Sequence, residues 1–121
     1  MARILIVDDS AFMRRIIRNM LEKAGYVEIY GVADGIQAVE MYGQLRPDLV
    51  LMDITMPNMD GLVALKEIRA ADAGANVVMC TAMGQEPMVI DAIRSGAKDF
   101  IVKPFKPERV LKAVESIIGV P

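Results

Sequence analysis

Four short apolar runs in this chain end at residues that could take part in phosphoryl chemistry. The endings are Asp8 and Asp9, Asp53, Thr81 and Lys103. Three carboxylates, a hydroxyl and an ammonium are groups that can hold a divalent cation and a phosphoryl group. If the runs are parallel strands, their carboxyl ends share one edge of a sheet, where open α/β sheets bind ligands. The four endings therefore predict a single site.

Asp53 is the expected nucleophile of this site, because a carboxylate can attack phosphorus and form an acyl phosphate. One anion must approach another in that reaction, so a cation is needed. Mg²⁺ prefers oxygen ligands and keeps several waters, which suits the residues present. We expect Asp9, Asp53 and the backbone carbonyl of Thr55 to hold the ion directly. Asp8 is expected to act through a bound water.

The remaining two strand ends are expected to contact the phosphoryl group. Lys103 would stabilise phosphoryl oxygens as a mobile point charge, and Thr81 would donate its hydroxyl. A cis peptide between Lys103 and Pro104 is one way to hold the lysine in place. Each residue alone has an ordinary structural explanation as a helix cap, a turn residue or a surface charge. The coincidence of four strand ends favours the chemical interpretation.

The chain between these residues alternates apolar runs with segments of helical periodicity. Runs of Val, Ile and Leu predict strands that are buried on both faces. Strands are expected over 3–7 and 27–32 and in the runs ending at 53, 81 and 103. Helices are expected over 11–24, 33–45, 62–71, 87–96 and from 107 onward. The expected fold is a doubly wound α/β fold with a five-stranded parallel sheet, five helices and strand order 2-1-3-4-5.

The composition predicts one globular domain covering 1–121. Hydrophobic residues make up 54% and charged residues 25%, which argues against disorder. The net charge of −2, without a basic cluster, does not favour nucleic acid. There is no histidine, which excludes histidine catalysis, and Cys80 is the one cysteine. With no membrane-length apolar run and no signal-peptide pattern, we expect a soluble cytoplasmic protein and no membrane partner.

The motifs at the strand ends resemble those of receiver domains in two-component signalling. They are Ile4–Asp9, Asp53–Pro57 with Asp60–Gly61, Thr81–Ala82 and Lys103–Phe105. The stretches 11–14, 81–85 and 96–100 resemble stand-alone chemotaxis response regulators of the CheY type in particular. That resemblance covers essentially the whole chain. It implies a flavodoxin-like fold, and CheY is itself a standard example of strand order 2-1-3-4-5.

The resemblance implies a phosphorylation switch. A sensor histidine kinase of the CheA type would donate the phosphoryl group to Asp53 in a Mg²⁺-dependent reaction. The Thr81 hydroxyl would then move toward that group, and Phe100 would rotate inward. Affinity for a flagellar motor switch protein or an adaptor would change, and a phosphatase is a further implied partner. Thr55 and Met83 would tune the lifetime of the acyl phosphate.

Phe100 stands where many relatives carry a tyrosine, so it cannot donate a hydroxyl hydrogen bond. The implied protein is a monomer. It promotes its own phosphorylation and dephosphorylation and is not an ordinary enzyme.

Three other functions share parts of this pattern. A flavin mononucleotide-binding electron carrier has the same fold, but Asp8 and Asp9 would repel its phosphate. A phosphatase with an aspartyl-phosphate intermediate would need an acid where Thr55 stands. A phosphorelay intermediate, or the receiver of a DNA-binding regulator, would have the same site. The short distance from Met1 to the first strand favours a natural single-domain protein.

Overall fold

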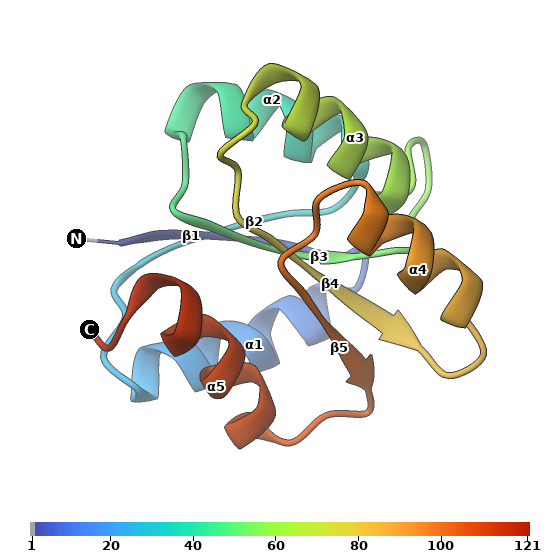
Figure 1. Ribbon diagram of the computed structural model, residues 1–121. Coiled ribbons are helices and arrows are strands. Elements are labelled where there is room, and N and C mark those ends of the chain that lie inside the picture. Colours follow the sequence, from blue (N-terminus) through green and yellow to red (C-terminus); the bar gives the residue numbers. More distant parts are fainter. Residues whose placement is uncertain (1) are drawn as a thin grey trace.

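Five parallel strands form one sheet with helices on both faces in the computed structural model, which describes residues 2–121 (Figure 1). The strands are β1 (Arg3–Val7), β2 (Glu28–Val32), β3 (Leu49–Asp53), β4 (Val77–Ala82) and β5 (Asp99–Lys103). The helices are α1 (Ala11–Lys23), α2 (Gly35–Leu45), α3 (Gly61–Ala71), α4 (Glu86–Arg94) and α5 (Pro107–Ile118). The strand order is β2-β1-β3-β4-β5, which confirms the predicted flavodoxin-like topology.

Two hydrophobic layers separate the helices from the sheet. Helices α2, α3 and α4 cover one face, and α1 and α5 cover the other (Figure 1). Alternate residues of β1 divide between the layers: Leu5 and Val7 pack toward α2 and α3, and Ile4 and Ile6 toward α1 and α5. This arrangement explains the continuous apolar runs of β1, β3 and β4, since a central strand needs apolar side chains on both faces.

The prediction that the apolar run of β5 is buried on both faces is wrong. Ile101 is 1% exposed, whereas Phe100 and Val102 on the opposite face are 37% and 41% exposed. β5 is an edge strand, and α4 contacts α3 and β4 rather than covering it. A groove of about 670 Å³ therefore remains between α4 and β5.

Several element boundaries differ from the predicted ones by one or two residues. β2 begins at Glu28 instead of position 27, and β4 continues to Ala82. Helix α4 ends at Arg94, before the predicted Gly96. Gly96 has a φ of +105°, and the N–H of Ala97 beyond it donates to the carbonyl of Ala92, which closes the helix early. These shifts leave the polar strand ends in place.

Within residues 2–121, none of the helices combines the length and apolar character needed to cross a bilayer.

Candidate functional site

The carboxyl edge of the sheet brings the predicted acidic residues and the lysine together. Carboxylate oxygens of Asp8, Asp9 and Asp53 lie within 4.8 Å of one another. The Lys103 ammonium lies 2.8 Å from Oδ2 of Asp8 and 3.3 Å from Oδ2 of Asp53. These groups come from the ends of β1, β3 and β5, so strand order alone makes distant parts of the sequence meet here.

Asp8 is the most deeply buried acid of this cluster, at 2% exposure. Its Oδ1 accepts the backbone N–H of Ser10 at 2.9 Å, and its Oδ2 accepts the Lys103 ammonium. The Ser10 side chain in turn caps α1 by accepting the N–H of Met13. Both Asp8 oxygens are thus engaged, while the neighbouring Asp9 is exposed. This difference is consistent with Asp9 as the direct ligand and Asp8 as an indirect one.

Burial and charge act in opposite directions on Asp53 and Lys103. Burial raises the pKa of Asp53; the positive charge of Lys103 opposes that change, and the nearby Asp8 adds to it. Burial alone would lower the pKa of Lys103, but the hydrogen bond to Asp8 and the charge of Asp53 outweigh it, so that pKa is raised. The lysine therefore carries its charge at neutral pH. The peptide bond between Lys103 and Pro104 is cis.

The donor set fits a hard divalent cation. Three carboxylates face one ammonium, so the charges sum to −3 + 1 = −2 when all are ionised. Burial raises the pKa of the Cys80 thiol to about 12, and no thiolate competes for a metal at neutral pH. Oxygen donors with an uncompensated double negative charge are what Mg²⁺ requires. Asp8, Asp9 and Asp53 are the residues that could hold it.

Thr81 and Phe100, the predicted switch pair, both line the groove between α4 and β5. Thr81 is 1% exposed near the end of β4. In the register of β4 with β5, Thr81 lies opposite Val102, and Phe100 lies opposite Met79. Phe100 points outward in this state, as its exposure shows. Thr81 and Phe100 therefore lie on adjacent strands along the same groove, where a movement of one side chain changes the space available to the other. Their switch roles stay predictions.

The loop from β3 to α3 carries Thr55, and contacts that sequence reasoning missed hold this loop. Asn58, with a φ of +66°, donates its amide to Oδ2 of Asp34 at 2.7 Å. The N–H of Gly35 donates to the carbonyl of Met59 at 3.0 Å. The partner of Asn58 lies 24 positions earlier in the chain, so no local pattern indicates this contact. Only the fold shows that the start of α2 supports this loop.

Gln85 is a second residue near the site that the sequence did not single out for a role. Its Oε1 accepts the N–H of Ala82 at 2.6 Å, and its Nε2 donates to the hydroxyl of Thr55 at 2.9 Å. A glutamine in a loop has no periodicity or spacing that would indicate such a bridge. The motif 81–85 was identified by resemblance, without a function for its last residue.

Comparisons with known proteins agree with this geometry. Residues 4–115 match the response regulator receiver domain family. The chain is 59% identical to the chemotaxis protein CheY of Bacillus subtilis over 117 residues, covering 97% of this chain and 98% of that protein. It is 55% identical to the chemotaxis protein CheY of Thermotoga maritima over 116 residues, covering 95% and 96%.

A solved structure also shares the fold over almost the full length. A chain in the crystal structure of the CheX-CheY-BeF3-Mg²⁺ complex from Borrelia burgdorferi superposes with a TM-score of 0.91 and 41% identity, covering 96% of this chain and 88% of that one. The residues matched by the family, 4–115, include the four polar strand ends. The chain therefore belongs to the response regulator receiver domains, as a CheY-like receiver of two-component chemotaxis signalling.

Proposed function

We propose that Asp53 accepts a phosphoryl group and that its modification switches the affinity of this receiver for an output partner. The observation that carries the proposal is the position of the Lys103 ammonium, which contacts both Asp8 and Asp53 within the acidic cluster. An ammonium held beside a partly exposed carboxylate can neutralise phosphoryl oxygens that arrive there. The side chain of Asp53 is 13% exposed, so a donor can reach it.

The transfer step is a displacement at phosphorus. A carboxylate oxygen of Asp53 forms a bond to phosphorus as the bond between phosphorus and the donor breaks. With acetyl phosphate the leaving group is acetate, and with a phosphohistidine it is the imidazole, which takes up a proton. An ionised carboxylate needs no general base to attack phosphorus, and the charge of Lys103 favours the ionised form of Asp53. Lys103 stabilises the transferred group, and the Thr81 hydroxyl contacts it after transfer.

Asp8, Asp9, Asp53 and the backbone carbonyl of Thr55 are the groups that would hold Mg²⁺ and its waters. The ion would supply the positive charge that lets the anionic donor approach the anionic acceptor. The oxygen-only cluster and its net charge of −2 support this assignment.

The proposed donor is a sensor histidine kinase of the CheA type, and the proposed output is a flagellar motor switch protein or an adaptor in the cytoplasm. The relatives named chemotaxis protein CheY support a chemotaxis kinase as the donor, and the resemblance described above implies the output partner. The complex of a CheY with CheX, BeF3 and Mg²⁺ supports magnesium as the metal and a CheX-like partner, which we propose to be a phosphatase.

Phosphorylation changes partner binding only to the extent that the phosphoryl group stabilises one state more than the other. The groove lined by Thr81 and Phe100 is where the two states would differ.

Intact mass after incubation with acetyl phosphate and Mg²⁺ tests the acceptor. We expect the mass of one phosphoryl group to be added to the wild-type chain. The gain should disappear in Asp53→Asn and in the presence of a chelator. A gain that persists in Asp53→Asn would assign the modification to another residue. If no sample gains mass, metal-dependent binding of beryllofluoride checks for a short-lived product, and its absence as well would overturn the proposal.

A further inference from the structure

The backbone of β4 presents an N–H group beside the acceptor that no strand satisfies. In a parallel ladder, alternate residues direct their backbone groups to the same neighbour. The carbonyl of Cys80 accepts the N–H of Ile54, so the N–H of Ala82 is also directed toward β3. β3 has already ended, and the carbonyl of Ile54 accepts the N–H of Gly61 instead. The Ala82 N–H therefore lies at the open end of the ladder, next to Asp53.

The side chain of Gln85 accepts a hydrogen bond from this N–H group. Its Oε1 accepts the Ala82 N–H at 2.6 Å, in the position a further residue of β3 would have filled. Its Nε2 reaches Thr55, two residues after Asp53, at 2.9 Å. Gln85 is half-buried while Ala82, Met83 and Gly84 before it are exposed. One amide thus joins the two loops that flank the acceptor.

The bridge is separate from the structure of α4. The backbone carbonyl of Gln85 accepts the N–H groups of Met88 and Val89 and so begins the helix. The side chain makes no capping hydrogen bond. Replacing the side chain would therefore remove both bridging bonds and leave the first turn of α4 intact.

We propose that Gln85 is a positioning residue that latches the two loops across the mouth of the acceptor site, and that this latch must open for Asp53 to take up a phosphoryl group. The inference rests on the function proposed above. A phosphoryl group on Asp53 places charged acceptor oxygens close to the Ala82 N–H. Those oxygens are stronger acceptors than the neutral amide of Gln85 and compete with it. The latch thus stabilises the unmodified state and slows transfer.

Phosphorylation kinetics with acetyl phosphate and Mg²⁺, followed by intact mass at several donor concentrations, test the latch. Gln85→Met keeps the length of the side chain but removes both hydrogen bonds. We expect a roughly three- to tenfold higher second-order rate constant for this variant, as expected for the loss of two exposed hydrogen bonds. Gln44→Met, the same substitution at an exposed position of α2, should leave the rate constant unchanged. An unchanged or lower rate in Gln85→Met would overturn the latch.

Two further measurements separate a latch from a general structural effect. Thr55→Val removes the hydroxyl that accepts the hydrogen bond from Gln85. Because both substitutions break the same bridge, the double variant with Gln85→Met should be phosphorylated no faster than Gln85→Met alone, and the two rate effects should not multiply. Amide exchange at Ala82 should be faster in Gln85→Met than in the wild type, and the melting temperature should fall by no more than the few degrees that the loss of two hydrogen bonds explains. Multiplying effects, or unaltered exchange at Ala82, would count against the latch. If no variant is phosphorylated or binds beryllofluoride, the acceptor assignment itself has failed, which is a different result.

Discussion

At the scale of single residues, Lys103 has two tasks that conflict. In the unmodified site its ammonium contacts Asp8 and Asp53, which also belong to the proposed metal site. In the proposed transfer the same ammonium would also neutralise the phosphoryl oxygens. A flexible side chain with a single compact charge can move between these partners, whereas the planar and wider guanidinium of arginine fits one geometry. The proposed transfer therefore favours a lysine over an arginine at this position.

Lys103→Met should separate the two tasks. Removing the ammonium leaves the carboxylates without their internal cation, so Mg²⁺ should bind at least as tightly as in the wild type. Phosphorylation by acetyl phosphate should fall at least tenfold because the phosphoryl oxygens lose their counter-charge. Calorimetry or a fluorescence titration measures the first effect, and intact mass the second. Weaker metal binding together with normal phosphorylation would contradict this account; Lys103→Arg is the charge-preserving control.

At the scale of elements, the close approach of α3 to the end of β3 fixes the position of Asp53. A Cβ atom on Gly61 would overlap the backbone carbonyl of Asp53 and come within 3.0 Å of Cα of Ile54. The N–H of Gly61 donates to the carbonyl of Ile54 at 2.6 Å, and the side chain of Asp60 caps the helix. The glycine is needed here for space and not for a special φ value.

Gly61→Ala should therefore damage stability and phosphorylation together. We expect a loss of about 2–3 kcal/mol in unfolding free energy, as is typical of a backbone clash. Phosphorylation should also slow, because Asp53 is displaced from Lys103. Gly43→Ala in α2 is the matched control: an added Cβ meets nothing within 4 Å, and stability should rise by about 0.5–1 kcal/mol. Denaturant unfolding gives both values, and equal effects at the two positions would contradict the steric argument.

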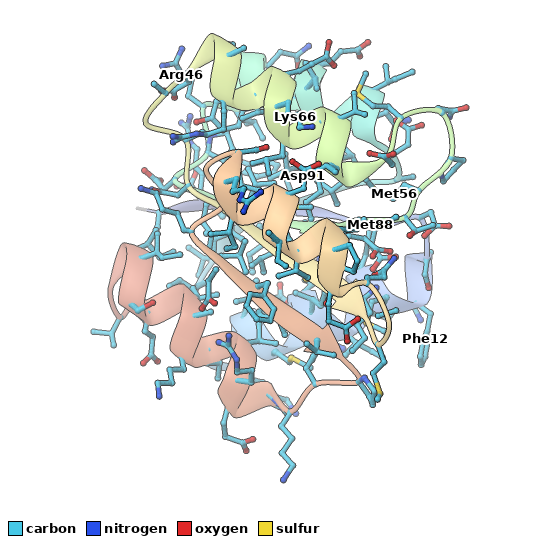
Figure 2. All side chains as sticks on the ribbon, turned by 45° about the vertical axis from the view of Figure 1, so that its right-hand side comes forward. Phe12, Arg46, Met56, Lys66, Met88 and Asp91 are labelled. Carbon is cyan, nitrogen blue, oxygen red and sulfur yellow. The ribbon has the colours of Figure 1, made fainter. Side chains whose placement is uncertain are left out.

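Helix α4 has fewer buried residues than its neighbour α3. Ala92 is its one fully buried residue, whereas α3 buries Gly61, Ala64, Leu65 and Ile68. Its ion pair to α3, between Lys66 and Asp91 at 3.5 Å, is exposed (Figure 2). Exposed pairs of this kind contribute little. A helix with so few buried contacts can shift at low cost, which suits its place along the groove of Thr81 and Phe100.

At the scale of the whole molecule, the two edges of the sheet serve different purposes. The carboxyl edge collects like charges that weaken the fold, and the opposite edge carries contacts that stabilise it. Helices α2 and α3 end at that opposite edge, where the Tyr42 hydroxyl donates to Oδ2 of Asp72 at 2.8 Å. Arg46 reaches the same oxygen at 3.4 Å. Because the site lies at the other end of the strands, changes here should affect stability alone.

Tyr42→Phe tests this separation. The loss of one hydroxyl hydrogen bond should lower the melting temperature by about 5 °C, while phosphorylation of Asp53 is unchanged. A parallel loss of phosphorylation would show that the two edges are coupled.

The same variant has an expected pH dependence. The hydrogen bond from Tyr42 is the main reason that the pKa of Asp72 lies below its ordinary value of 3.8. A depressed pKa in the folded state stabilises the protein above the ordinary pKa and loses that effect as pH falls through the folded value. The stability difference between wild type and Tyr42→Phe should therefore be constant near neutral pH and shrink below about pH 4. Thermal unfolding across this range measures it, and a difference that grows in acid would contradict the assignment.

The sequence by itself determined the fold and the groups available for chemistry. Apolar runs that end in polar residues specify buried parallel strands and place their ends at one edge, so Asp8, Asp9, Asp53, Thr81 and Lys103 could be named before any coordinates.

Only the tertiary structure decided which residues act on that site from elsewhere in the chain. Two hydrogen bonds join segments that the fold brings together: the one from Asn58 to Asp34 and the one from Gln85 to Thr55. The exposure of Phe100 likewise depends on how the helices cover the sheet. A single side chain carries no local signal for a partner 24 or 30 positions away, because the distance between them is set by the packing of the sheet and its helices. For this reason the candidate acceptor could be predicted from the sequence, whereas the contacts that hold its loops could not.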